Sequence, residues 1–176
     1  GDGFLITPTG MPYDECRPDD MVHMSYSGDI TGRHKPSSEW RFHHDLYVDR
    51  PEFGAVVHVH SSFATTMACM GKDIPPFHYM IAVAGGKDIR CAPYFAFGSR
   101  ELSDAVQVAM KGRSACLLGN HGLLAAGPET GHMRQTAGLI RQIIYARQFS
   151  RSYCRLGTLD LGRRPVCPRS RRNSPK

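Results

Sequence analysis

The sequence has no apolar run long enough to cross a membrane. Hydrophobic residues make up 41% of its 176 residues, but no uninterrupted apolar segment approaches the roughly 20 residues that a membrane-spanning helix needs. Residues 1–6 also lack the basic and long apolar regions of a secretory signal peptide. We therefore expect a globular protein rather than a membrane-spanning or secreted one.

The cysteines form no C-x-x-C pair and no dense framework. They are scattered along the chain as Cys16, Cys69, Cys91, Cys116, Cys154 and Cys167. Three of them lie in apolar segments, where a free cysteine acts as a small hydrophobic residue. We expect reduced thiols and a cytoplasmic location rather than a disulfide scaffold.

Most of the chain has little net charge. The formal net charge is +6, but residues 151–176 hold seven Arg and one Lys against one Asp, whereas residues 1–150 hold 14 basic and 15 acidic residues. The basic character therefore does not indicate nucleic-acid binding by the fold. We expect one domain over residues 1–155 and a disordered, basic Arg/Pro-rich tail over residues 156–176.

Predicted strands and helices alternate along the chain, without an internal repeat. Hydrophobic patterning and turn residues predict strands at 3–7, 21–25, 54–60, 89–93, 115–118 and 123–126, and helices at 36–49, 61–70, 99–111 and 129–153. This alternation favours an α/β layered domain.

The first predicted helix starts in the segment Pro36-Ser37-Ser38-Glu39. A serine there can cap the free amide groups, with Glu39 in the first turn. The spacing of apolar and aromatic residues predicts one buried stripe on this helix. Its members are Trp40, His43, His44 and Tyr47.

Three histidines form a candidate metal site. His58 and His60 are two apart on a predicted strand, so their side chains point to the same face. His121 lies in a predicted turn between two glycines, which allow the backbone to bend. Three imidazoles can hold zinc and leave a position open for substrate. Glu39 is a candidate base beside such an ion.

This spacing has a plainer interpretation. Histidines two apart on a strand are more often core or surface residues than metal ligands. We interpret five other histidines as structural or exposed, namely His23, His34, His43, His44 and His132. The residues alone leave a metal-dependent hydrolase or lyase and a structural cluster both open.

Longer motifs carry more information. They are residues 5–13 (LITPTGMPY), 36–43 (PSSEWRFH), 57–60 (VHVH), 78–86 (HYMIAVAGG), 91–94 (CAPY), 97–102 (FGSREL) and 121–123 (HGL). In this order, and over roughly residues 2–150, they resemble the class II aldolase/adducin-head family. The resemblance implies a three-layer α/β/α domain with a central, mostly antiparallel sheet, assembled as a fourfold homotetramer.

The resemblance also implies an activity. It indicates a metal-dependent aldolase that reversibly cleaves L-fuculose 1-phosphate, or a related ketose 1-phosphate, to dihydroxyacetone phosphate and L-lactaldehyde. One zinc ion per subunit would be held by His58, His60 and His121. Glu39 corresponds to the base that takes the proton from the donor carbon, and Tyr79 to an acid–base group that reaches a neighbouring subunit's site.

The phosphate-binding positions of the family correspond to Thr9, Gly10, Ser37 and Ser38. Hydroxyls and free amides at a helix start suit a phosphate. Each residue also has a plainer interpretation, since Thr9-Gly10 can form only a turn and a serine only a cap. Tyr79 can likewise be an ordinary interface aromatic. The order of the motifs along the chain favours the functional interpretation.

The resemblance does not extend to either end of the family's domain. The opening helix with its Gly-Asn-rich segment has no counterpart, and neither Tyr145 nor Tyr153 matches the tyrosine of the closing tail. Two alternatives remain. A sugar-phosphate 4-epimerase of the family carries a carboxylate where this chain has residues 79–81 (YMI). A non-catalytic, adducin-head-like interaction module would not need the three histidines and Glu39.

Overall fold

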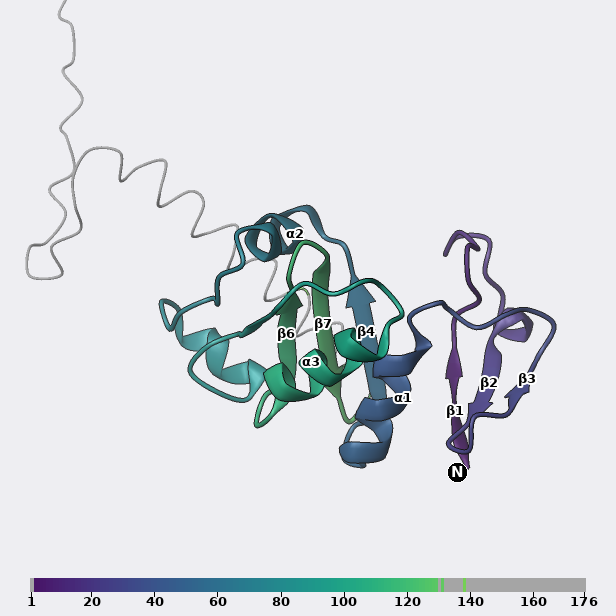
Figure 1. Ribbon diagram of the computed structural model, residues 1–176. Helices are drawn as coiled ribbons and strands as arrows, with labels where there is room; N and C mark the ends of the chain where they lie inside the picture. The colour runs from purple at the N-terminus through teal and green to yellow at the C-terminus, as the bar shows by residue number, and fades with distance from the viewer. Residues whose placement is uncertain (1, 130, 132–137, 139–176) are drawn as a thin grey trace, which may run out of the picture.

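The computed structural model describes residues 2–129, 131 and 138. Its main sheet has four strands. The strands run in the order β4 (Ala55–Val59), β7 (Gly122–Gly127), β6 (Ala115–Leu118) and β5 (Cys91–Ala92), and Figure 1 labels β4, β6 and β7. β7 is antiparallel to both β4 and β6, whereas β5 is parallel to β6. The expected central, mostly antiparallel sheet is therefore confirmed.

Helices cover both faces of this sheet. Leu117 and Leu123 pack on one face with α2 (Ser62–Cys69) and the 3-10 helix η2 (Tyr79–Ala84). Their chain neighbours Cys116 and Leu124 pack on the other face with α1 (Trp40–Asp49) and α3 (Arg100–Met110). Successive residues alternate between the two faces, as strand geometry requires. The three-layer α/β/α architecture is confirmed, and Figure 1 shows α1 and α3 on the same side of the sheet.

The predicted stripe on the first helix is wrong. Phe42 and Leu46 are the fully buried residues of α1, and both face the four-stranded sheet. Trp40 and Tyr47 are only partly buried, because they face a second, smaller sheet. α1 lies between two packing surfaces, so a single buried stripe could not describe it.

The second sheet consists of the antiparallel strands β1 (Gly3–Ile6), β2 (Val22–Ser25) and β3 (Ile30–Thr31). Its buried side chains pack against Trp40 and Tyr47, and they are Phe4, Ile6, Val22 and Met24. A short 3-10 helix, η1 (Pro18–Asp20), precedes β2. The sequence predicts the first two strands but not that they form a sheet of their own.

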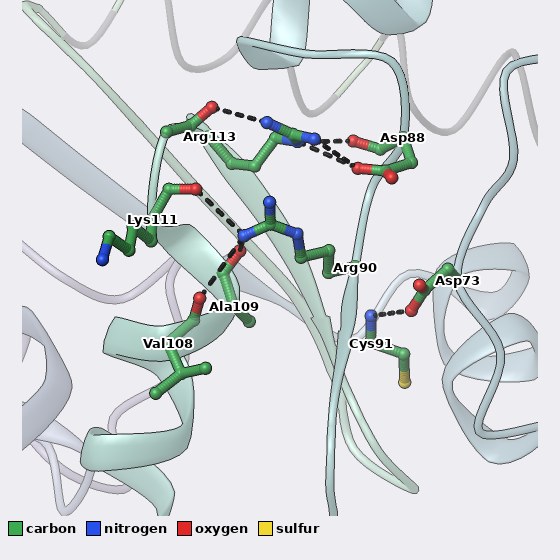
Figure 2. Close-up of polar contacts among 9 residues, drawn as sticks. Asp73, Asp88, Arg90, Cys91, Val108, Ala109, Lys111 and Arg113 are labelled. Carbon is green, nitrogen blue, oxygen red and sulfur yellow. Dashed lines mark hydrogen bonds and ion pairs between the residues drawn. The ribbon is translucent and has the colours of Figure 1, made fainter.

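Arginine side chains tie the edge of the main sheet to the end of α3 (Figure 2). Arg90 Nη1 donates to the carbonyl oxygen of Lys111 at 2.9 Å, at the C-terminal end of α3. Arg113 donates to both Asp88 Oδ1 and the Asp88 carbonyl oxygen. β5 is shorter than the predicted strand 89–93 at both ends. Ile89 pairs with Ile74 instead, and Pro93 has no N–H to donate to a ladder.

Two remaining predictions, the helix at 129–153 and the disordered tail at 156–176, lie largely or wholly outside the described residues. Within the described part of the chain, none of the helices has the length and apolar character that crossing a membrane requires. Four cysteines in that part are free thiols: Cys16, Cys69, Cys91 and Cys116.

Candidate metal centre

The three candidate histidines meet at one edge of the four-stranded sheet. β4 and β6 both run antiparallel to β7, so they end at the edge where β7 begins. His58 lies near the end of β4, His60 directly follows that strand, and His121 lies in the turn from β6 to β7. Together with Glu39 they offer ligand atoms that all lie within 4.8 Å of one another. We call these four residues the metal group.

The distances from His58 and His121 to Glu39 fit a small ion, and the His58–His60 distance is shorter. His58 Nε2 lies 2.8 Å from His60 Nε2 and 3.2 Å from Glu39 Oε2. His121 Nε2 lies 3.3 Å from Glu39 Oε1. Donors about 2.0–2.1 Å from a tetrahedral ion lie roughly 3.3 Å apart. Three imidazoles and one carboxylate are also a donor set that zinc accepts.

The turn that carries His121 is held in a specific conformation. Asn120 has a positive φ of 53°, in the left-handed region that asparagine tolerates better than most residues. Its backbone N–H donates to the carbonyl oxygen of Ala68 in α2 at 3.2 Å. The Thr65 hydroxyl, also in α2, donates to the His121 carbonyl oxygen at 3.4 Å. α2 therefore fixes the turn that presents the third histidine.

A backbone carbonyl orients His58. Its Nδ1 lies 3.1 Å from the carbonyl oxygen of Leu123 in β7, which can only accept a hydrogen bond. Nδ1 must therefore carry the proton, which leaves the lone pair on Nε2 directed into the metal group. The edge of the ring also contacts Phe42 in α1, with ring centroids 5.6 Å apart.

Glu39 does not lie in the first turn of the helix, where the sequence places it. α1 begins at Trp40, so Glu39 occupies the N-cap rather than the first turn, and no side chain caps the helix. Ser37 Oγ instead accepts a hydrogen bond from the Glu39 backbone N–H at 3.3 Å. The Glu39 carboxylate cannot cap its helix because it points to His58 and His121.

The Glu39 carboxylate is largely enclosed, with 13% of its side chain exposed. Its Oε1 atom is buried and, within the described residues, has no partner in hydrogen-bond geometry, although His121 is close. A buried carboxylate oxygen left in this way fits a metal ligand. Burial acts to raise the pKa of Glu39, but the neighbouring His121 and His58 outweigh it and lower the pKa far below its usual range.

Two imidazoles in and beside the metal group have a lowered pKa. Partial loss of hydration is the main cause at His60, although this residue is exposed overall, and His58 and His121 add to it. Burial likewise lowers the pKa of His43 to about 4, and His43 packs against Phe42 behind the metal group. Metal ligation requires neutral imidazole, so the low pKa of His60 favours it. His43 lies outside the metal group, in line with a structural role.

The four candidate phosphate residues lie on two adjacent segments. Thr9 N–H donates to the Lys35 carbonyl oxygen at 3.0 Å, and Ser37 N–H donates to the Thr7 carbonyl oxygen at 2.9 Å. These bonds bring Thr9-Gly10 beside Ser37-Ser38, which we call the phosphate segments. Because Ser38 directly precedes Glu39, the phosphate segments border the metal group.

Tyr79 does not join the metal group of its own chain. It opens η2, stacks on His78 with ring centroids 5.0 Å apart, and is 82% exposed.

A cavity of about 720 Å³ lies between β5 and α3, and it shares no lining residue with the metal group.

Sequence reasoning missed two supporting features. The Leu123 carbonyl that orients His58 is a backbone group, which no motif reveals. Gly98 is required by space, since a Cβ there would lie 2.5 Å from the Ser38 carbonyl oxygen. The place of Gly98 in the FGSREL motif indicates such a close contact, because a glycine in a fixed turn often marks a close approach of two backbone segments.

The chain is similar in sequence to known proteins. The family described as Class II Aldolase and Adducin N-terminal domain matches residues 1–145. The 5-methylthioribulose-1-phosphate/5-deoxyribulose-1-phosphate aldolase of Rhodospirillum rubrum is 54% identical over 127 residues, which cover 72% of this chain and 58% of that protein. The L-fuculose phosphate aldolase of Escherichia coli (strain K12) is 49% identical over 124 residues, which cover 70% and 58%.

A solved structure has the same fold. An L-fuculose 1-phosphate aldolase superposes with a TM-score of 0.83 at 35% identity, covering 87% of this chain and 72% of that chain. The chain spans 58% of the length of the two curated relatives above.

Proposed function

Because this chain belongs to the class II aldolase and adducin N-terminal domain family, we propose that it provides the catalytic domain of a metal-dependent aldolase. The proposed reaction is the reversible cleavage of L-fuculose 1-phosphate, or a related ketose 1-phosphate, to dihydroxyacetone phosphate and an aldehyde. The observation that carries this proposal is the convergence of Glu39 and three histidines within 4.8 Å.

The proposed cofactor is one zinc ion per subunit. His58, His60 and His121 would hold it through Nε2 atoms, and the Glu39 carboxylate would complete the donor set before substrate arrives. When bound, such an ion supplies a Lewis acid that polarises the carbonyl group of the sugar phosphate. No lysine Schiff base is then needed for cleavage.

The remaining chemistry is proton transfer by the chain's own residues. In the direction of synthesis, Glu39 takes a proton from the carbon next to the carbonyl of dihydroxyacetone phosphate, and that carbon attacks the aldehyde. Tyr79 protonates the aldehyde oxygen as the carbon–carbon bond forms. In cleavage, Tyr79 accepts the hydroxyl proton as the same bond breaks, and Glu39 returns its proton to the donor carbon.

Tyr79 would act in a neighbouring subunit's site. Its side chain is 82% exposed and lies outside the metal group of its own chain, which supports a role between subunits. We therefore include a homotetramer in the proposal, with active sites at subunit interfaces, and a cytoplasmic location.

The phosphate segments would bind the phosphate of the substrate. Thr9, Ser37 and Ser38 offer hydroxyl groups, and Gly10 adds a backbone that no side chain obstructs. Their position beside Glu39 would place the phosphate next to the reacting carbons. Hydroxyl and amide donors in a turn suit an anion of this kind.

A second substrate class has specific support. The Rhodospirillum rubrum relative, named for 5-methylthioribulose 1-phosphate and 5-deoxyribulose 1-phosphate, is 54% identical, against 49% for the Escherichia coli L-fuculose phosphate aldolase. These compounds share a ketose 1-phosphate end and differ beyond the broken bond. Both classes require the same metal group and phosphate segments.

The test is a cleavage assay of the purified chain on L-fuculose 1-phosphate, 5-deoxyribulose 1-phosphate and 5-methylthioribulose 1-phosphate. We expect dihydroxyacetone phosphate from at least one of them, loss of activity after exhaustive chelation, and recovery with zinc. The relative kcat/KM values identify the substrate class. Activity that survives complete metal removal would contradict the mechanism.

The same assay separates the alternatives. An epimerase would convert a pentulose phosphate without releasing dihydroxyacetone phosphate, but residues 79–81 (YMI) offer no carboxylate for it. A non-catalytic module would neither cleave substrate nor bind a divalent ion. The convergence of four ligating side chains favours the enzyme.

A further inference from the structure

Gly122, the first residue of β7, borders two histidines of the metal group. Its φ lies outside the positive range found at Asn120, so its backbone conformation does not require glycine. The lack of room for a side chain does require it. A Cβ on Gly122 would lie 2.6 Å from the Val59 carbonyl oxygen, 2.9 Å from His60 Cδ2 and 3.3 Å from His58 Cε1. Real Cβ atoms essentially never approach another atom to within 3.0 Å.

The neighbours of Gly122 differ in their freedom to move. Val59 pairs with Leu123 in the β4–β7 ladder, so its carbonyl oxygen cannot retreat without disturbing the strands. The imidazole rings are the movable parts, and their Nε2 atoms lie 2.8 Å apart. A methyl group at position 122 would push the His60 ring away by several tenths of an ångström before Cβ and His60 Cδ2 reached ordinary van der Waals contact. Metal–ligand distances tolerate only about 0.2 Å.

We propose that Gly122 is a positioning residue for the metal centre, where the absence of a side chain sets the approach of the His58 and His60 rings. This inference rests on the proposed function, in which both rings bind the ion. The next residue, Leu123, acts on His58 through its carbonyl oxygen. Two consecutive residues of β7 therefore control the same ligand, one through clearance and one through a hydrogen bond.

The experiment compares Gly122→Ala with Gly54→Ala. Gly54 lies at the opposite end of the β4–β7 pair, where a Cβ would also meet a carbonyl oxygen, that of Pro128. Zinc affinity is measured by competition with a chromophoric chelator, and the absorption spectrum of bound Co²⁺ reports ligand geometry. Gly122→Ala should lower the unfolding midpoint, because its Cβ also meets a backbone carbonyl oxygen. In addition, we expect it to weaken zinc binding about 10- to 100-fold and to change the Co²⁺ spectrum. Gly54→Ala should lower the unfolding midpoint and leave both readouts unchanged.

Two results would overturn the inference. One is a Gly122→Ala protein with the zinc affinity and Co²⁺ spectrum of the wild type. The other is a Gly122→Ala protein that fails to fold both with and without zinc, because the glycine would then serve the strand pair rather than the metal. A wild-type protein that binds no zinc contradicts the proposed function itself, so the two failures are distinguishable.

A double variant provides a second measurement. His60→Ala removes the nearer of the two rings, so the loss of zinc affinity caused by Gly122→Ala should shrink in that background. The coupling between the two substitutions is obtained from four affinities, with His60→Ala alone as the reference. A Gly122→Ala penalty that is undiminished without the His60 ring would also overturn the inference.

Discussion

The metal group and the phosphate segments border each other but are built by different means. The metal group consists of three histidine side chains at strand ends and the Glu39 side chain at the start of α1. The side chains of His58, Glu39 and His121 are only 11–14% exposed, whereas His60 is exposed. The phosphate segments are joined by backbone hydrogen bonds between loops. Thr9, Gly10 and Ser38 are exposed there. One region fixes side-chain atoms, and the other presents hydroxyl and amide groups on a loop surface.

The difference matches what each region is proposed to bind. Metal ligands must meet within a few tenths of an ångström, which requires the support of a packed sheet. A phosphate accepts hydrogen bonds from many directions, so loop donors suffice. Glu39 connects the two regions, because its backbone N–H bonds to Ser37 while its carboxylate joins the metal group. Substitutions should therefore separate into effects on metal, on turnover and on substrate affinity.

The largest effect is expected from a metal ligand. His58→Ala removes an imidazole whose orientation Leu123 fixes, and we expect zinc affinity to fall by more than about 100-fold, with cleavage activity lost. His23→Ala is the matched control, because His23 lies on β2 of the small sheet. Zinc is measured by chelator competition. Equal zinc affinity in the two variants would remove His58 from the metal group.

A large effect on turnover is expected from Glu39→Gln. Loss of the proposed base should lower kcat about 10²- to 10⁴-fold, while the three histidines still retain zinc. Asp45→Asn is the matched control, since this carboxylate also lies on α1 but is bonded to His44 and Ser103. Steady-state kinetics and elemental analysis provide the readouts. Near-normal kcat in Glu39→Gln would rule out the proposed base.

A smaller effect on turnover is expected from Tyr79→Phe, because Tyr79 is proposed to act only where two subunits meet. Removing the exposed hydroxyl should lower kcat by about 100-fold without changing zinc content. Co-expression of differently tagged Tyr79→Phe and Glu39→Gln chains should restore part of the activity, because an interface can then combine an intact Glu39 with an intact Tyr79. Mixed assemblies as inactive as their parents would show that Tyr79 does not act between subunits.

The sequence predicts the sheet and the metal group better than it predicts the helix between them. Strong apolar runs predict β4, β6 and β7, and an alternating strand places His58 and His60 on one face. The predicted start of α1 is wrong because the Glu39 carboxylate is held by histidines that are distant in sequence. The predicted buried face of α1 is wrong because the helix packs against two sheets. Both errors arise from tertiary contacts that local patterns do not contain.

The smallest effect is expected in the phosphate segments. Ser38→Ala removes one exposed hydroxyl, and a hydrogen bond to a charged group contributes about 1.5–3 kcal/mol. Since backbone amides and neighbouring hydroxyls remain, we expect KM for the ketose phosphate and Ki for inorganic phosphate to rise together by about 10-fold, with kcat and zinc content unchanged. Ser27→Ala, in the turn between β2 and β3, is the control. A Ser38→Ala protein that loses zinc or turnover instead would show that the phosphate segments and the metal group are not separable. The hydrogen bond from the Glu39 N–H to Ser37 Oγ would then transmit the change to the carboxylate.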